Sequence, residues 1–299
     1  MFKIYAITEK GFNFFELKNT ENNSVARISL EEGGRLQKLQ FNNTILIEDQ
    51  PNFKYEDSFA SAILFPFASR IENGAYTFKG KNYQFECNEK GRNNALHGLV
   101  FNKKFKLLEK EITSNSCAIT IYYSEKNASK GFPYKYSIYL TYTLLKDELQ
   151  LKVSVKNDDI KAFPYTLGWH PYFINNDLHN SSLNFKCDKK VVFNENLITK
   201  KITDYKKEEL LKIENKQLDD CFFLIDDKIQ FTTPSYHFEL SSNIKKNYLQ
   251  IYTPKGIAAI AIEPLTGISN SFNNEIGLQT LEPNTSYSIK WNLKLCNKN

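Results

Sequence analysis

Two of the four histidines stand in short motifs that could carry acid–base chemistry. His97 lies in the segment Asn94-Ala-Leu-His97-Gly98, beside a glycine that follows a polar loop. His170 lies in Leu167-Gly-Trp-His-Pro-Tyr-Phe173, where the proline after it disfavours strand pairing and predicts a strand edge or a loop. Functional side chains concentrate in loops carried by a rigid sheet. The alternative is that each histidine is a hydrogen-bonded packing residue.

A carboxylate completes this candidate acid–base set. Glu263 follows the run Ile257-Ala-Ala-Ile-Ala-Ile262, whose continuous apolar character predicts a central strand covered on both faces. A carboxylate at the end of a buried strand is costly unless it is paired or used. Burial would raise its pKa toward that of a general base acting near neutrality. The alternative is a strand-end side chain that reaches water.

Three further polar residues could hold a ligand. Arg70 follows an apolar stretch, and its guanidinium could bind a sugar oxygen or a carboxylate, or form a structural salt bridge. Asp219 is either a turn residue or an acceptor for a hydroxyl. Gln250 alternates with apolar neighbours within a predicted strand. His179 and His237 have no such context, and we expect them to be surface or packing residues.

Strands must position these side chains, because period-2 alternation of apolar residues dominates the chain. Tyr136–Leu144 and Leu149–Val155 alternate strictly on either side of a Lys-Asp-Glu turn, which predicts an antiparallel hairpin. Tyr287–Leu295 repeats the pattern. Looser strands are expected at Val25–Leu30, Tyr76–Phe85, Cys117–Tyr123 and Phe238–Leu240.

Helical periodicity is scarce and predicts only a short surface helix over Lys206–Ile213. Many strands separated by Asn, Asp, Gly and Lys turns favour a β-sandwich or barrel with very little helix. The 12 glycines and 9 prolines form no linker, and no repeat is present, so residues 1–299 are expected to be a single domain. By analogy of shape, the concave face of such a sandwich suits an extended ligand such as a sugar.

Composition narrows the classes of function. The chain has 299 residues, a net charge of +5 and no basic block, which argues against a nucleic-acid partner. An odd number of cysteines, five, without a CxxC spacing predicts reduced thiols. The N-terminal residues lack the apolar core of a secretory signal, and no apolar run is long enough to cross a bilayer. We therefore expect a cytoplasmic protein with no membrane partner.

In combination, these segments resemble the aldose 1-epimerase (mutarotase) family over roughly residues 65–295. The resemblance rests on motifs in a fixed order along the chain. They are Phe67-Ala-Ser-Arg70-Ile-Glu-Asn-Gly74, Leu96-His97-Gly98, Gly168-Trp-His170-Pro-Tyr-Phe173, Leu218-Asp219, Gln250-Ile-Tyr-Thr253 and Glu263-Pro264 followed by Ser271-Phe-Asn273. The His-Pro-Tyr-Phe motif with the later Glu-Pro and Phe-Asn is specific as a set.

The resemblance implies a large antiparallel β-sandwich of the galactose mutarotase type that interconverts the α and β anomers of a free aldohexose. Glu263 would then remove the proton of the anomeric hydroxyl, and His170 would protonate the ring oxygen. It implies that His97 and Arg70 hold the region of the ring oxygen, and that Asp219 and Gln250 bind sugar hydroxyls. A sugar is the expected partner, to a monomer or homodimer, and no cofactor or metal is expected.

Three departures from the family pattern concern the substrate. Ser69 stands where the familiar mutarotases have Asn, and Leu99 stands where they usually have a second glycine. The segment Pro-Leu-Thr-Gly-Ile-Ser-Asn after Glu263 also differs from the usual sequence of galactose enzymes. The branch that acts on hexose 6-phosphates has an arginine at the position of Phe101, for which Lys103, Lys104 or Arg92 could compensate. That activity therefore remains the nearest alternative.

Two other classes of function are open at this stage. A non-catalytic sugar-binding protein could use the same fold, although the presence of the histidines and Glu263 argues against it. His97, His170 and Glu263 could also form a zinc site of a hydrolase. The 73 residues that separate the two histidines (170 − 97) give that reading no local support.

Overall fold

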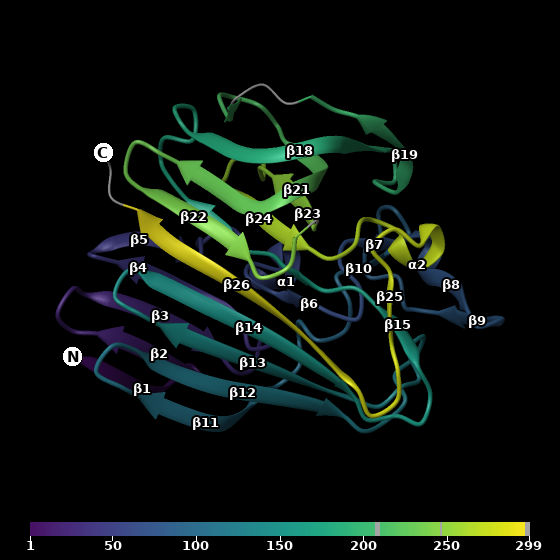
Figure 1. Cartoon of the computed structure of the whole chain (residues 1–299), viewed down its shortest axis with the longest axis horizontal. Coiled ribbons are helices and arrows are strands. Elements are labelled where there is room, and N and C mark those ends of the chain that lie inside the picture. The colour runs from purple at the N-terminus through teal and green to yellow at the C-terminus, as the bar shows by residue number, and fades with distance from the viewer. Residues whose placement is uncertain (207–209, 246, 297–299) are drawn as a thin grey trace.

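The computed structural model describes residues 1–206, 210–245 and 247–296, and these residues fold mainly into antiparallel strands (Figure 1). The central path of the largest sheet runs through strands far apart in the sequence. In spatial order they are β11 (Lys106–Ile112), β12 (Cys117–Glu125), β13 (Tyr136–Leu144), β14 (Glu148–Asn157), β26 (Ser286–Cys296), β22 (His237–Ser242), β21 (Asp219–Thr232), β23 (Tyr248–Tyr252), β24 (Ala259–Leu265), β16 (Gly168–Trp169) and β6 (Ile63–Leu64).

Shorter strands branch from this path or form small sheets of their own. The branches are β17 (Tyr172–Ile174), on β24, and β18 (Ser182–Phe193), which joins β21 to β19 (Thr199–Asp204) and β20 (Leu211–Lys212). The small two-stranded sheets are β7 (Arg70–Ile71) with β10 (Ala95–Leu96), β8 (Ala75–Phe78) with β9 (Lys81–Gln84), and β15 (Phe163–Tyr165) with β25 (Gln279–Leu281).

A second sheet packs against one half of the first and makes the fold a sandwich. Its strands are β1 (Phe2–Glu9), β2 (Phe12–Asn19), β3 (Ser24–Ser29), β4 (Leu36–Phe41) and β5 (Thr44–Glu48), which lie behind β11–β14 in Figure 1. Leu17 and Ile28 from this sheet share one buried core with Ile121 and Leu140 from the other. The all-β sandwich expected from the sequence is therefore confirmed.

Regular alternation produced the most accurate strand predictions. β13 begins and ends at the predicted residues, and its inward side chains are completely buried. The expected partner strand is β14, and the C-terminal pattern is β26. The range Tyr76–Phe85 forms a hairpin of two strands, β8 and β9, because Lys79 and Gly80 both turn the chain with positive φ.

Two expectations about local structure were wrong. Glu263 does not end its strand, since β24 continues through it and Pro264 to Leu265, with neighbouring strands pairing on both sides. Leu211 and Lys212 form β20 instead of a helix, because pairing with β18 outweighs local propensity. The remainder of that expected helix includes residues 207–209, which lie outside the described residues. The α-helices of the described chain are α1 (Tyr55–Ser58) and α2 (Ser271–Asn274).

No helix among the described residues has the length and apolar character needed to span a membrane. All five cysteines lie in the described part of the chain, and no disulfide joins any two of them.

Gly98 allows two segments to cross at a distance that a side chain would prevent. Its φ is +76°, and a Cβ there would lie far inside van der Waals contact with the carbonyl oxygen of Phe65. The same oxygen accepts a hydrogen bond of 2.7 Å from the amide of Leu99. This close approach fixes the loop that carries His97.

Replacing Gly98 with alanine should therefore lower the free energy of unfolding by roughly 2–4 kcal/mol, since backbone strain and a backbone clash add. Urea denaturation measures this. Gly80→Ala is a matched control, because Gly80 also has positive φ (+73°) but has open space around it; it should lose only about 1 kcal/mol. Equal losses in the two variants would show that the crossing does not constrain the loop.

Candidate active site

Three adjacent strands form a polar floor for the candidate site. Gln250 of β23 lies directly opposite Glu263 of β24 and opposite Cys221 of β21. Paired residues in adjacent strands project from the same face of a sheet, as do residues two apart in one strand. Asp219 is two residues before Cys221 and accepts a hydrogen bond of 2.7 Å from Gln250 Nε2. The register therefore gathers Asp219, Gln250 and Glu263 on one face.

His170 reaches this face from the interrupted segment between β16 and β17. Its amide donates to the carbonyl of Ala62 (3.0 Å), and its carbonyl accepts from Ser61 (2.8 Å), so the backbone is held on both sides. Its Nε2 lies 3.3 Å from Oε1 of Glu263. The residue before a proline thus lies in a break between strands, as predicted, and forms a buried contact with the carboxylate.

The small β7–β10 sheet carries one wall of the cavity. Arg70 lies in β7, and His97 directly follows β10. Arg70 pairs with Leu96, and the amide of His97 donates to the carbonyl of Ser69 at 2.9 Å. The ring of His97 stands edge-on to that of His170, with their centroids 4.9 Å apart. The two histidines, 73 residues apart in sequence, are therefore neighbours.

All six predicted site residues line one cavity of about 420 Å³. They are Arg70, His97, His170, Asp219, Gln250 and Glu263. Glu263 is 3% exposed, His170 5% and His97 8%. Such burial argues against the reading of Glu263 as a strand-end residue that reaches water.

Burial also changes the acid–base properties of these groups. Desolvation raises the pKa of Glu263 well above its usual range, and the carboxylate of Asp219 raises it further, whereas Arg70 lowers it. Desolvation lowers the pKa of His170 to about 4. It also lowers the pKa of His97 well below its usual value, with a contribution from His170. The uncharged forms of Glu263 and His170 are thus favoured. The one proton that the pair shares therefore lies on the carboxyl group of Glu263.

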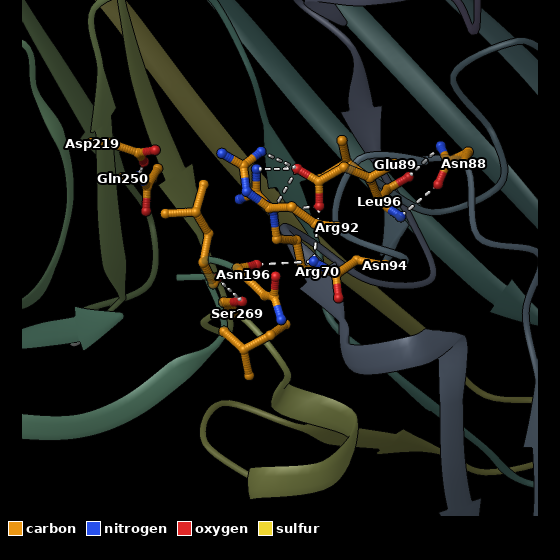
Figure 2. Close-up of polar contacts among 12 residues, drawn as sticks. Arg70, Asn88, Glu89, Arg92, Asn94, Leu96, Asn196, Asp219, Gln250 and Ser269 are labelled. Atoms are coloured by element: carbon orange, nitrogen blue, oxygen red, sulfur yellow. Dashed lines mark hydrogen bonds and ion pairs between the residues drawn. The ribbon is translucent and has the colours of Figure 1, made fainter. Parts of the chain in front are cut away.

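Arg70 forms the salt bridge that its sequence context left open, while still lining the cavity. Its Nε and Nη2 donate to the carboxylate of Glu89, with the shortest distance 2.8 Å. Glu89 also accepts from Arg92 at 3.1 Å. Figure 2 shows these residues together, with Asp219 and Gln250 on the neighbouring strands (Figure 2).

Several residues that line the cavity were not among those predicted, and they include Glu89, Tyr172 and Tyr252. Tyr252 follows Gln250 by two residues, so strand alternation could have placed it on the same face. Tyr172 lies within the His-Pro-Tyr-Phe motif. Glu89 lies in a polar loop that, in the sequence, is indistinguishable from a solvated turn.

The positively charged residues considered for a phosphate lie in different places. Arg92 lines the cavity. Lys104 instead pairs with Glu31 at 3.0 Å, and Lys103 lies over the ring of Tyr123. Neither lysine lines the cavity. His179 and His237, expected to be surface or packing residues, lie elsewhere, beside Asn215 and Thr232 respectively.

The side chains do not form a metal cluster within the described ranges. No group of three or more His, Cys, Asp or Glu residues there has a geometry that could hold a metal ion. His170 and Glu263 contact each other directly instead. The zinc-hydrolase alternative therefore has no geometric support in this part of the chain.

Comparison with known proteins gives one family. The family model for aldose 1-epimerase matches residues 14–294. The uncharacterized protein YihR of Escherichia coli K12 is 24% identical over 273 residues, which cover 87% of each chain.

Two solved structures share the fold. A galactose mutarotase-like protein from Clostridium acetobutylicum has a TM-score of 0.86 at 21% identity and covers 99% of both chains. A galactose 1-epimerase from Lactobacillus acidophilus has a TM-score of 0.84 at 13% identity and covers 100% of both chains. At such identities the two structures establish the fold alone.

The buried carboxyl group predicts a stability effect with a defined pH dependence. Because its pKa is raised, Glu263 binds a proton in the native protein that it releases in the unfolded chain. Wild-type stability is therefore reduced as the pH rises above the ordinary glutamate pKa and toward the native one. Glutamine does not titrate, so Glu263→Gln should be more stable than the wild type by about 1 kcal/mol near pH 8. Urea denaturation between about pH 5 and about pH 8 should show this gain growing with pH.

Glu282→Gln, at an exposed position, is the control and should show no such trend. A gain that is constant with pH would show that burial does not shift the titration of Glu263.

Proposed function

This chain belongs to the aldose 1-epimerase family, and on that premise we propose that it interconverts the α and β anomers of a free aldohexose. The observation that carries the proposal is the contact of a buried carboxyl group and a buried imidazole, 3.3 Å apart, in a cavity lined by four further sugar-binding candidates. Inversion at the anomeric carbon needs one group that accepts a proton and one that donates it, without a redox step.

In this proposal, Glu263 and His170 act on the two oxygens of the anomeric carbon. The carboxylate of Glu263 takes the proton of the anomeric hydroxyl while protonated His170 donates to the ring oxygen. The bond between the anomeric carbon and the ring oxygen breaks, and the anomeric carbon becomes an aldehyde. Rotation about the bond to the next carbon presents the other face, and the ring closes as both protons return.

The protonation states are consistent with the burial of the pair. The ionised pair, with carboxylate and imidazolium, holds the same number of protons as the uncharged pair that desolvation favours. A hydroxyl and an ether oxygen bound at these two groups supply hydrogen bonds to the ionised forms. A sugar can therefore shift the pair to its reactive form without exchange of a proton with solvent.

The remaining residues are assigned to orientation of the sugar. Arg70 and His97 bind near the ring oxygen, and Asp219 and Gln250 bind hydroxyls. The mutual hydrogen bond of Asp219 and Gln250 leaves each with further capacity, since a carboxylate and an amide both make several hydrogen bonds.

Two further expectations belong to the same proposal. The chain acts as a single domain, because the residues of the cavity come from widely separated segments between Glu56 and Glu263. It acts in the cytoplasm, which the absence of disulfides among the five cysteines of the described residues supports.

A hexose 6-phosphate is the second candidate substrate, favoured by one observation. Arg92 lines the cavity and has a side chain that is 42% exposed. It would have to bind the phosphate without Lys103 and Lys104. Comparing mutarotation rates for glucose, galactose and glucose 6-phosphate distinguishes the two candidates.

Removing either member of the acid–base pair should abolish most activity. Glu263→Gln and His170→Asn should each lower kcat by about 10²–10⁴-fold, the contribution of a positioned acid or base, while sugar binding stays measurable by calorimetry. Mutarotation of freshly dissolved α-D-glucose and α-D-galactose, followed by polarimetry, measures the rate. Glu239→Gln and His237→Asn, outside the cavity, are the matched controls. Near wild-type turnover in either pair variant contradicts the assigned role.

Arg70→Ala should impair both binding and rate, because the guanidinium contacts the sugar in the ground state and in the transition state. We expect kcat/KM to fall by about 10²-fold, with KM raised. Steady-state kinetics and thermal unfolding should be measured together. A change confined to thermal stability would favour a purely structural salt bridge.

A further inference from the structure

Glu89 is the centre of a hydrogen-bond network in the cavity wall. Its carboxylate accepts from Arg70 Nε (2.9 and 3.1 Å) and Nη2 (2.8 Å), from Arg92 Nη1 (3.1 Å) and from Asn94 Nδ2 (2.9 Å). Its side chain is 12% exposed. Figure 2 shows the carboxylate of Glu89 bonded to both guanidinium groups (Figure 2). A carboxylate that satisfies two arginines at once is more than a surface ion pair.

We propose that Glu89 is a positioning residue for the anomerisation proposed above, acting by fixing Arg70 and by offsetting its charge beside the acid–base pair. The inference rests on the proposed function. It concerns a residue that does not itself touch the reacting atoms.

Glu89 fixes the orientation of the Arg70 guanidinium. Two of the three guanidinium nitrogens of Arg70 are engaged by Glu89, and Nη1 has no hydrogen-bond partner among the described residues. Nη1 is therefore the nitrogen left for a substrate oxygen. A guanidinium held in this way loses little conformational entropy when the substrate binds.

The loop that carries Glu89 is itself held rigidly. The amide of Glu89 donates to the carbonyl of Asn94 (3.1 Å). The side chain of Asn88 bonds both backbone groups of Leu96, donating at 3.1 Å and accepting at 2.7 Å. Leu96 is the strand partner of Arg70. Asn94 also donates to the carbonyl of Asn196, across the cavity wall. The backbone segments that carry the Glu89 carboxylate and the Arg70 guanidinium are thus held at a fixed distance from each other.

Glu89 also acts on the acid–base pair electrostatically, through the charge of Arg70. Glu263 is faced by Asp219 from β21, by Arg70 from β7 and by His170, with Tyr172 and Cys221 also nearby. Arg70 lowers the pKa of Glu263 and that of His170, after the larger effect of burial in each case. Without the Glu89 carboxylate, the positive charge of Arg70 would be unbalanced and would act on the pair more strongly. Glu89 therefore limits how far Arg70 lowers the pKa of the base, Glu263.

The test compares Glu89→Gln, which removes the charge, with Glu89→Asp, which keeps the charge on a shorter side chain. Glu89→Gln should lower kcat/KM by about 10- to 100-fold and move the acid limb of its pH profile about half a unit lower. Glu89→Asp should lose kcat/KM while its profile stays at the wild-type position. Should Glu89→Gln fail to fold, Glu89→Asp still decides the positioning role.

Glu32→Gln is the matched control, because Glu32 also holds a buried arginine, Arg35, at 2.8 Å and lies outside the cavity. It should reduce stability without changing kcat/KM or the pH profile. Repeating Glu89→Gln in an Arg70→Ala background tests the route of the effect. There it should change kcat/KM by less than about twofold, since a residue that acts only through Arg70 has nothing left to position.

Wild-type kcat/KM in both folded Glu89 variants, or equal losses with and without Arg70, would overturn the inference. The wild-type protein provides the separate check on the proposed function. If it accelerates mutarotation of no tested sugar, the proposed function fails first. If it is active and the Glu89 variants match it, only the role of Glu89 fails.

Discussion

Backbone pairing across β21, β23 and β24 is the constraint on which the candidate site depends. The register sets Gln250 opposite Glu263 and places Asp219 within hydrogen-bond distance of Gln250. Alternate side chains of the same strands, such as Ile251 and Ile262, are completely buried in the core. A slip of one residue would exchange these two faces and turn Glu263 into the core. The hydrogen bonds that stabilise the sheet therefore also assemble the polar floor of the cavity.

Burial of this polar floor shifts the pKa values on which the proposed chemistry depends, and it also lowers the stability of the fold. A carboxyl group and an imidazole in contact with water would titrate at their ordinary values, whereas here desolvation moves the two pKa values in opposite directions. The cost of burying such groups is met by the large apolar core between the two sheets. The wall that carries Arg70 differs from this floor, because Arg70 and Arg92 share the carboxylate of Glu89. The cavity thus combines a wall of paired charges with a floor of groups that can change protonation.

Irregular backbone brings the wall that carries Arg70 and His97 against the polar floor. His97 and Ser69 both have positive φ, a conformation that costs energy for residues other than glycine. Their amide–carbonyl hydrogen bond holds the two segments side by side, and the contact of Gly98 with Phe65 locks the crossing. Such strain persists only where surrounding packing determines it, and here the packing is that of the sandwich core. The position of the His97 ring beside His170 is therefore a property of the whole fold.

The sequence by itself determined the strands with strict alternation, as at Tyr136–Leu144, and identified six of the polar residues that line the cavity. Periodicity can do this because side-chain direction in a strand depends only on local geometry. It could not show that β24 continues through Pro264, or that Leu211 pairs with β18, because those outcomes depend on neighbouring strands. Only the tertiary structure joined Arg70 to Glu89 and left Lys103 and Lys104 outside the cavity. Proximity between residues distant in sequence is set by chain crossings and by burial, which no local pattern encodes.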